Sequence, residues 1–151
     1  MPEIHMTPEE FSDSIQPAEI TGFLIDVYAE TASVVTVPNN YKAFCKFLDC
    51  ECITIQDRYI GRKARRNSVQ HRYDIICDDN AQDRDPVKIS AIDDLGDIML
   101  VGNLFIVRHD GQGKEESLTP EDIAYIKGYV MMQGTRCFPK PYPMLCQCAY
   151  L

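Results

Sequence analysis

Six basic side chains gather between Arg58 and Arg72, and no acidic residue interrupts them. A guanidinium group presents its N–H donors in a planar fork that matches the oxygens of a phosphate or a carboxylate. Two tyrosines at the ends of this basic segment would add flat faces on which a base could stack. The predicted binding residues are Arg58, Tyr59, Arg62, Lys63, Arg65, Arg66, Arg72 and Tyr73.

The basic segment also has an interpretation that involves no ligand. It lies between two β-prone runs, and eight aspartates follow it between Asp74 and Asp97. An exposed hairpin tip whose cations balance those aspartates would have the same composition, and such surface ion pairs contribute little to stability. The sequence supports both interpretations equally.

Nucleophilic catalysis would require a thiol, a base and an orienting carboxylate to meet. Cys77 and His109, with an aspartate, are the candidates, and the chain has no P-loop, dinucleotide-binding glycine pattern or H-E-x-x-H motif. The apolar flanks of Cys77 instead indicate a buried, unreactive thiol beside a histidine in a turn. The sequence therefore predicts no catalytic residue and a protein that is not an enzyme.

Metal-binding patterns are also weak. The aspartates between Asp78 and Asp85 lack the glycine and the glutamate that a calcium loop places at its sixth and twelfth positions. The seven cysteines include two C-x-C pairs, 50/52 and 146/148, whereas structural zinc sites usually use wider spacing. In a reducing compartment disulfides are not expected either. We predict neither a metal nor a cofactor.

The clearest elements are a strand over residues 99–107 and a helix that begins at Thr119. The strand is rich in β-branched and aromatic residues. Thr119 is a good N-cap and Pro120 suits the first helical position, while Leu118 and Ile123 can form a hydrophobic staple. Apolar spacing predicts that this helix continues towards Gly134, as a structural support and not as a site.

The remaining patterns complete an α-ββ-α-ββ-ββ-α order, which is typical of an α+β fold. We expect an antiparallel or mixed sheet of about 5–6 strands with two to three packed helices. The expected elements are a helix over 8–15, strands over 22–28 and 33–37, a helix after Asn40, and strands over 52–60, 71–77 and 87–92. The expected organisation is an N-terminal helical extension (1–20), the α+β domain (21–135) and a C-terminal tail rich in Pro and Cys (136–151).

Length and composition suit one folded domain. The chain has 151 residues, 45% of them apolar, and a formal charge of −8. It has no apolar run of about 18 residues and does not open with a secretory signal pattern, so we expect a cytoplasmic protein with no membrane contact. The apolar tail has no evident place in a domain closed by its last helix, and this predicts a homodimer.

Several segments resemble, in the same order, those of the DUF3846 family, an uncharacterised domain of phages and bacterial mobile elements. The resemblance covers about residues 20–130, and the loop over 62–72 looks longer and more basic than the family norm. No catalytic residues are agreed for the family, so none are carried over. The segments are Gly22–Val27, Arg58–Gly61, Tyr73–Asp79, Lys88–Asp93, Gly102–Val107 and the helix start Ser117–Thr119.

The resemblance implies a protein that acts in a bacterial host cell for a phage or a mobile element. The leading hypothesis is a non-enzymatic binding protein that inhibits a host defence system through its acidic body or its basic hairpin loop. Its partner would be a protein or ribonucleoprotein of that system. The alternative is a nucleotide- or nucleic-acid-binding protein that uses Arg58–Arg72 to hold phosphates, and the third hypothesis is a small cysteine-dependent enzyme.

Overall fold

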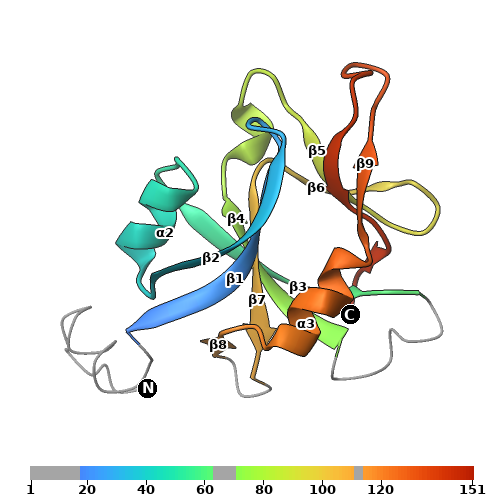
Figure 1. Ribbon diagram of the computed structural model, residues 1–151. Coiled ribbons are helices and arrows are strands. Elements are labelled where there is room, and N and C mark those ends of the chain that lie inside the picture. Colours follow the sequence, from blue (N-terminus) through green and yellow to red (C-terminus); the bar gives the residue numbers. More distant parts are fainter. Residues whose placement is uncertain (1–17, 63–70, 111–113) are drawn as a thin grey trace.

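The computed structural model describes residues 18–62, 71–110 and 114–151, which form two β-sheets and two α-helices (Figure 1). The larger sheet has the order β11-β3-β4-β7-β1-β2, with β8 paired to β7, and the smaller has the order β6-β5-β10-β9. Nearly all neighbouring strands run antiparallel; β10 and β5 are parallel. This architecture confirms the predicted α+β class. The two sheets hold more strands than the one sheet expected, because the C-terminal segment and two two-residue strands also pair.

The bounds of the elements are as follows. The larger sheet contains β1 (Glu19–Asp26), β2 (Thr31–Pro38), β3 (Ile53–Ile60), β4 (Arg72–Asp78), β7 (Leu104–His109), β8 (Glu115–Glu116) and β11 (Cys148–Ala149). The smaller sheet contains β5 (Ile89–Ile92), β6 (Ile98–Val101), β9 (Val130–Gln133) and β10 (Tyr142–Leu145). The helices are α2 (Tyr41–Phe47), α3 (Pro120–Lys127) and a short 3-10 helix, Ala81–Asp83.

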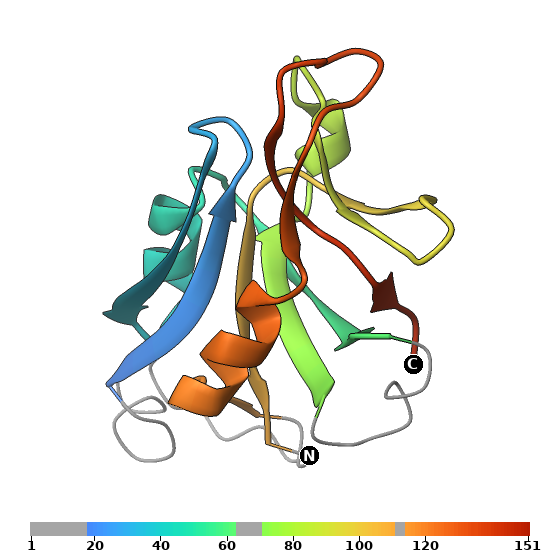
Figure 2. The same ribbon diagram turned by 45° about the vertical axis from the view of Figure 1, so that its right-hand side comes forward.

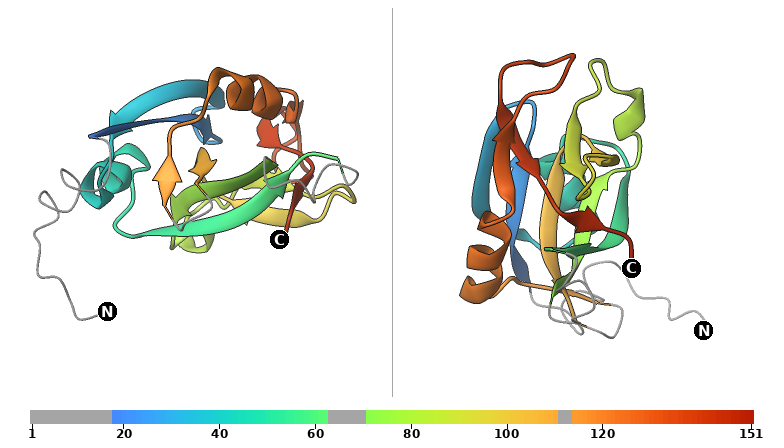
Figure 3. Two further views of the ribbon diagram at one scale, coloured as in Figure 1. Left: turned by 90° about the horizontal axis from the view of Figure 1, so that it is seen from below. Right: turned by 90° about the vertical axis from the view of Figure 1, so that its right-hand side faces the viewer.

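The central strands of the larger sheet, β4 and β7, are buried on both faces, and each face packs against a different helix. On one face, Ile75 and Ile106 join Ile126 of α3 and the smaller sheet in the main core. On the other face, Ile76 and Phe105 pack against Phe44 of α2. Figure 2 shows α3 in front of the sheet and α2 behind it, and the view from below in Figure 3 shows the sheet curling, with β1 and β2 on one side of the core and β3 and β4 on the other.

Helix α3 begins as predicted but ends earlier. The Thr119 hydroxyl accepts from the Asp122 backbone N–H, and the Asp122 carboxylate accepts from the backbone N–H of Thr119, which completes a capping box. Gly128 then takes the C-cap position, and Val130 belongs to β9 and not to the helix. The apolar spacing that continued past Gly128 was therefore misleading, because a strand took over where glycine weakens a helix.

Gly102 divides the predicted strand over 99–107 into two strands of different sheets. Its φ is +79°, a backbone angle that residues other than glycine rarely adopt. A Cβ at this position would lie 2.8 Å from the Cβ of Ala81. The chain turns at this point from β6 in the smaller sheet to β7 in the larger sheet. One apolar run thus contributes to both sheets.

The C-terminal segment 136–151 is not an extended tail. Strand β10 pairs with β9 and β5, and β11 pairs with β3, so the segment joins both sheets. Tyr142, Leu145 and Cys148 are completely buried in the main core. The homodimer was expected because this segment had no place in the domain, and the fold removes that reason.

Two sequence predictions fall on residues that the structure does not describe. These are the N-terminal helix over 8–15 and the central cations of the basic segment, Lys63, Arg65 and Arg66. Within the described ranges, no helix is long and apolar enough to cross a membrane.

Candidate functional site

The paired strands β3 and β4 carry the ends of the basic segment on opposite faces of the larger sheet. Arg58 lies directly opposite Tyr73, and Tyr59 lies opposite Arg72. Because successive side chains of a strand point to opposite faces, Arg58 and Tyr73 share the face of the main core, whereas Tyr59 and Arg72 share the other. The predicted strand residues therefore do not form one binding surface.

The two strand arginines already have partners within the fold. Arg58 is only 9% exposed, its guanidinium lies 4.6 Å above the ring of Tyr150, and its Nη1 donates to the carbonyl of Asp57. Arg72 donates from Nη2 to Oδ2 of Asp57 over 3.0 Å. Both guanidinium groups are thus engaged in the structure of the sheet itself.

The other predicted binding residues differ in exposure. Tyr73 is completely buried, so its ring faces the core, and only its hydroxyl reaches a polar neighbour. Tyr59 is half-buried, and Arg62 is exposed at the last described position before residues 63–70. Of the predicted residues that the structure describes, Arg62 is the one best placed to meet a partner.

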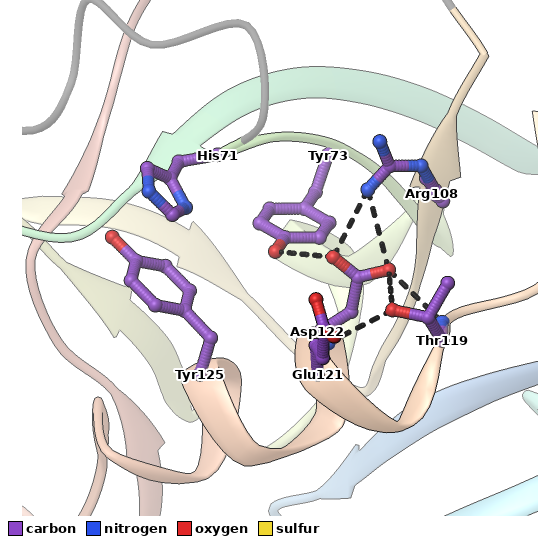
Figure 4. Close-up of a pocket in the computed structure, with 7 residues that line it drawn as sticks. All are labelled: His71, Tyr73, Arg108, Thr119, Glu121, Asp122 and Tyr125. Carbon is purple, nitrogen blue, oxygen red and sulfur yellow. Dashed lines mark hydrogen bonds and ion pairs between the residues drawn. The ribbon is translucent and has the colours of Figure 1, made fainter.

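A pocket of about 430 Å³ lies between α3 and the neighbouring ends of β4 and β7 (Figure 4). Its wall is almost entirely polar or aromatic, and it includes one residue of the predicted set, Tyr73. The lining residues are His71, Tyr73, Arg108, Thr119, Glu121, Asp122 and Tyr125.

Asp122 is the polar centre of this α3 pocket. Its carboxylate accepts from the Thr119 backbone N–H and hydroxyl, from the Tyr73 hydroxyl, and from Nη1 of Arg108, all over 2.9 to 3.0 Å. Burial alone would raise the pKa of Asp122, but these hydrogen bonds and the charge of Arg108 outweigh burial and lower it. Burial, and then the charge of Asp122, raise the pKa of Tyr73. The pocket thus contains a fixed, ionised carboxylate that is neutralised by its own neighbours.

Tyr125 of helix α3 contacts the chain on both sides of residues 62–70. Its hydroxyl donates to the carbonyl of Ile60 over 2.8 Å, and a Cβ on Gly61 would overlap that hydroxyl. Its ring stacks on His71, with 4.0 Å between centroids and 16° between planes. Figure 4 shows these two rings facing each other beside the carboxylate of Asp122.

Sequence reasoning missed Arg108 and Tyr125, and it gave Asp122 only a capping role. The capping box was a usable signal for the position of Asp122 on α3. Nothing in the sequence indicated that Arg108 of β7 would reach Asp122, because that contact depends on how α3 lies across the sheet.

The cysteine-histidine site considered from the sequence does not assemble. Cys77 points into the main core, whereas His109 lies on the opposite face, with its Nδ1 3.0 Å from Oδ1 of Asp74. Burial raises the pKa of the Cys77 thiol to about 12. The two C-x-C pairs also stay apart, because Cys50 packs beside α2 and Cys148 lies in the main core.

The start of the acidic stretch forms a local turn. The Asp78 carboxylate accepts from the backbone N–H of Asn80 and from Nε of Arg84. These contacts stabilise the chain reversal.

Comparisons with protein-family models, with curated proteins and with solved structures found no match to this chain. The resemblance to DUF3846 therefore stays a prediction from the sequence.

Proposed function

We propose that the protein is a non-enzymatic binding protein of a phage or mobile element that inhibits a host defence system. It would recognise a protein or ribonucleoprotein of that system through an anionic group, using the basic segment 58–72 and the adjoining α3 pocket. The resemblance to DUF3846 supports the genomic setting. Because family resemblance is an association and not a mechanism, the argument for the surface has to come from the residues themselves.

The observation that carries the proposal is the double contact of Tyr125. Gly61 and His71 stand on either side of residues 62–70, and Tyr125 contacts both. The described residues on either side of the four cations Arg62, Lys63, Arg65 and Arg66 therefore both contact Tyr125, a residue that lines the pocket. Cations of this kind suit an anionic group, because guanidinium and ammonium groups form charge-assisted hydrogen bonds with it.

The charges within the pocket are compatible with this partner chemistry. Arg108 offsets the charge of Asp122 and three further donors occupy its oxygens, so the carboxylate at the centre of the pocket opposes an anion only weakly. Glu121 is the exception, since it is exposed and lines the pocket. An anionic partner should therefore bind more tightly when Glu121 loses its charge.

Thiol chemistry supports a non-enzymatic role. Burial raises the pKa values of Cys50, Cys77 and Cys148 to about 12. The thiolate is the nucleophile, and thiols with such pKa values are almost fully protonated at neutral pH. These three cysteines are poor candidates for the nucleophile of a cysteine-dependent enzyme.

The test compares what the wild-type protein and charge variants retain from host cells. The variant Arg62→Ala/Arg65→Ala/Arg66→Ala removes three cations of the segment, and Lys42→Ala/Lys46→Ala/Lys140→Ala removes three exposed cations elsewhere. We expect a partner that co-purifies with the wild type and the lysine control, is lost from the arginine variant, and dissociates as salt rises. Glu121→Gln should retain more of it.

Two further results would decide between the hypotheses. Nuclease treatment that removes the retained material would favour the nucleic-acid-binding alternative, whose binding also falls steeply with salt. Equal retention by the arginine variant and the wild type would contradict the proposed surface. A host strain with active defence systems should admit more phage when it expresses the wild type than when it expresses the arginine variant.

A further inference from the structure

Three metal-ligand side chains from three neighbouring strands meet on the face of the larger sheet that also carries α2. They are Asp57 of β3, Asp74 of β4 and His109 of β7. Nδ1 of His109 lies 3.0 and 3.1 Å from the two carboxylate oxygens of Asp74 and 3.9 Å from Oδ1 of Asp57. All three ligand atoms lie within 4.8 Å of one another, and this is the only such group found among the described residues.

The register of the strands explains why these residues converge. Asp57 lies directly opposite Asp74, and Asp74 lies opposite Val107, two positions before His109. Residues two apart on a strand share a face, so all three side chains point to the side of Val107 and α2. Glu115 of β8 lies directly opposite His109 and therefore points to the same side.

The carboxyl groups of this cluster lie close together, with little exposure to solvent at its centre. The Asp74 side chain is only 3% exposed, yet the carboxyl group of Asp57 lies within hydrogen-bonding reach of it. Two carboxyl groups, those of Asp57 and Asp74, thus share one imidazole and the guanidinium of Arg72.

We propose that Asp57, Asp74 and His109 bind a divalent transition-metal ion. Metal bonds of about 2.1 Å place neighbouring ligand atoms about 3 Å apart, close to the separations between His109 and Asp74. An imidazole beside carboxylates favours Mn²⁺, Fe²⁺ or Zn²⁺ over Ca²⁺ and Mg²⁺, which prefer oxygen alone.

The neighbouring residues fit this assignment. Arg72 donates to Oδ2 of Asp57 and leaves Oδ1, the oxygen that faces His109, for the ion. Partners of this kind orient metal ligands in other proteins, so Arg72 is a positioning residue here. The ion would join β3, β4 and β7, and since the Asp57 side chain is 37% exposed, remaining coordination positions would face solvent.

The test is Mn²⁺ binding to the purified full-length chain. Binding is measured as the decrease in the electron paramagnetic resonance signal of free Mn²⁺. Mn²⁺ is the probe because it prefers oxygen and imidazole ligands and binds poorly to the free cysteines. The variants are Asp57→Asn, Asp74→Asn and His109→Gln, and Asp83→Asn is the control, because it removes one exposed carboxylate from the acidic stretch. Thermal melting without metal establishes that each variant is folded.

We expect one Mn²⁺ per wild-type chain and a melting temperature that rises with its concentration. Each ligand variant should raise the dissociation constant at least about tenfold, and Asp83→Asn should leave it unchanged. Asp57→Asn is the decisive variant if the buried Asp74→Asn fails to fold. Wild-type protein that leaves the signal of free Mn²⁺ unchanged, or His109→Gln protein that binds as well as wild type, would overturn the proposal. Neither result depends on the partner proposed above.

Discussion

At the scale of single residues, Asp122 has the largest set of polar contacts in the α3 pocket. It links the helix cap at Thr119 to Tyr73 of β4 and Arg108 of β7. A buried carboxylate with several donors is stabilising while it is charged, and it leaves those donors without an acceptor once it is removed. The residue is therefore important to stability whether or not the pocket binds a ligand.

Asp122→Asn should lower the free energy of unfolding by about 2 kcal/mol at neutral pH, the scale of hydrogen bonds to a charged group. Because the folded-state pKa of Asp122 lies below its ordinary value of 3.8, its stabilisation is fully present above that value and is lost as the pH falls through the folded-state pKa. Wild type should thus lose more stability than Asp122→Asn on acidification. Urea unfolding from pH 7 to pH 2 measures this, with exposed Glu121→Gln as the control, and parallel curves for wild type and Asp122→Asn would contradict it.

At the scale of elements, sequence patterns located starts and turns better than ends and contacts. The cap at Thr119 was predicted because it depends on local backbone chemistry. The end of α3 was missed because β9 forms through pairing with β10, a segment that follows later in the chain. Local spacing carries no information about such a partner.

Local sequence patterns could not locate the candidate sites for the same reason. Alternation along a strand predicts that Arg58 and Tyr59 face opposite sides, but which side is buried depends on the position of the smaller sheet. The cluster of Asp57, Asp74 and His109 requires the register of β3, β4 and β7, which are far apart in sequence. Residue type alone placed Asp74 in an acidic stretch and His109 in a turn.

The N-cap of α3 gives a prediction at this scale. Thr119→Ala should cost about 1 kcal/mol of stability, because its hydroxyl no longer satisfies the Asp122 backbone N–H. Thr119→Ser keeps the hydroxyl and should cost less. Thermal and urea unfolding measure both variants, and loss of partner binding by Thr119→Ala with unchanged unfolding would contradict a purely structural role for the cap.

Tyr125 gives a second prediction, since it joins α3 to both ends of residues 62–70. Tyr125→Phe keeps the ring over His71 and removes the hydrogen bond to Ile60, so it should cost about 1 kcal/mol and leave partner binding nearly intact. Tyr125→Ala also removes the stacked ring and should weaken partner binding. If both variants bind the partner equally well, the Tyr125 ring does not contribute to binding, and the basic segment acts independently of the pocket.

At the scale of the whole molecule, the C-terminal segment closes the structure. It follows α3, forms β10 between β5 and β9 in the smaller sheet, and then reaches β3 at the edge of the larger sheet through β11. Both sheets and the core between them therefore depend on the last residues of the chain, and the larger sheet would otherwise end at β3.

Deletion of residues 136–151 should consequently prevent folding and not merely change the oligomeric state. The segment buries Tyr142, Met144, Leu145 and Cys148 almost completely in the main core. Full burial of a large apolar side chain contributes about 1.5–3 kcal/mol, and a domain has only about 5–15 kcal/mol of net stability to lose. Circular dichroism should show an unfolded or aggregated product, whereas deletion of only the exposed Tyr150 and Leu151 should leave a cooperative unfolding transition. A folded monomer lacking residues 136–151 would mean that the domain is complete without β10 and β11 and that the segment is free to pair with another chain.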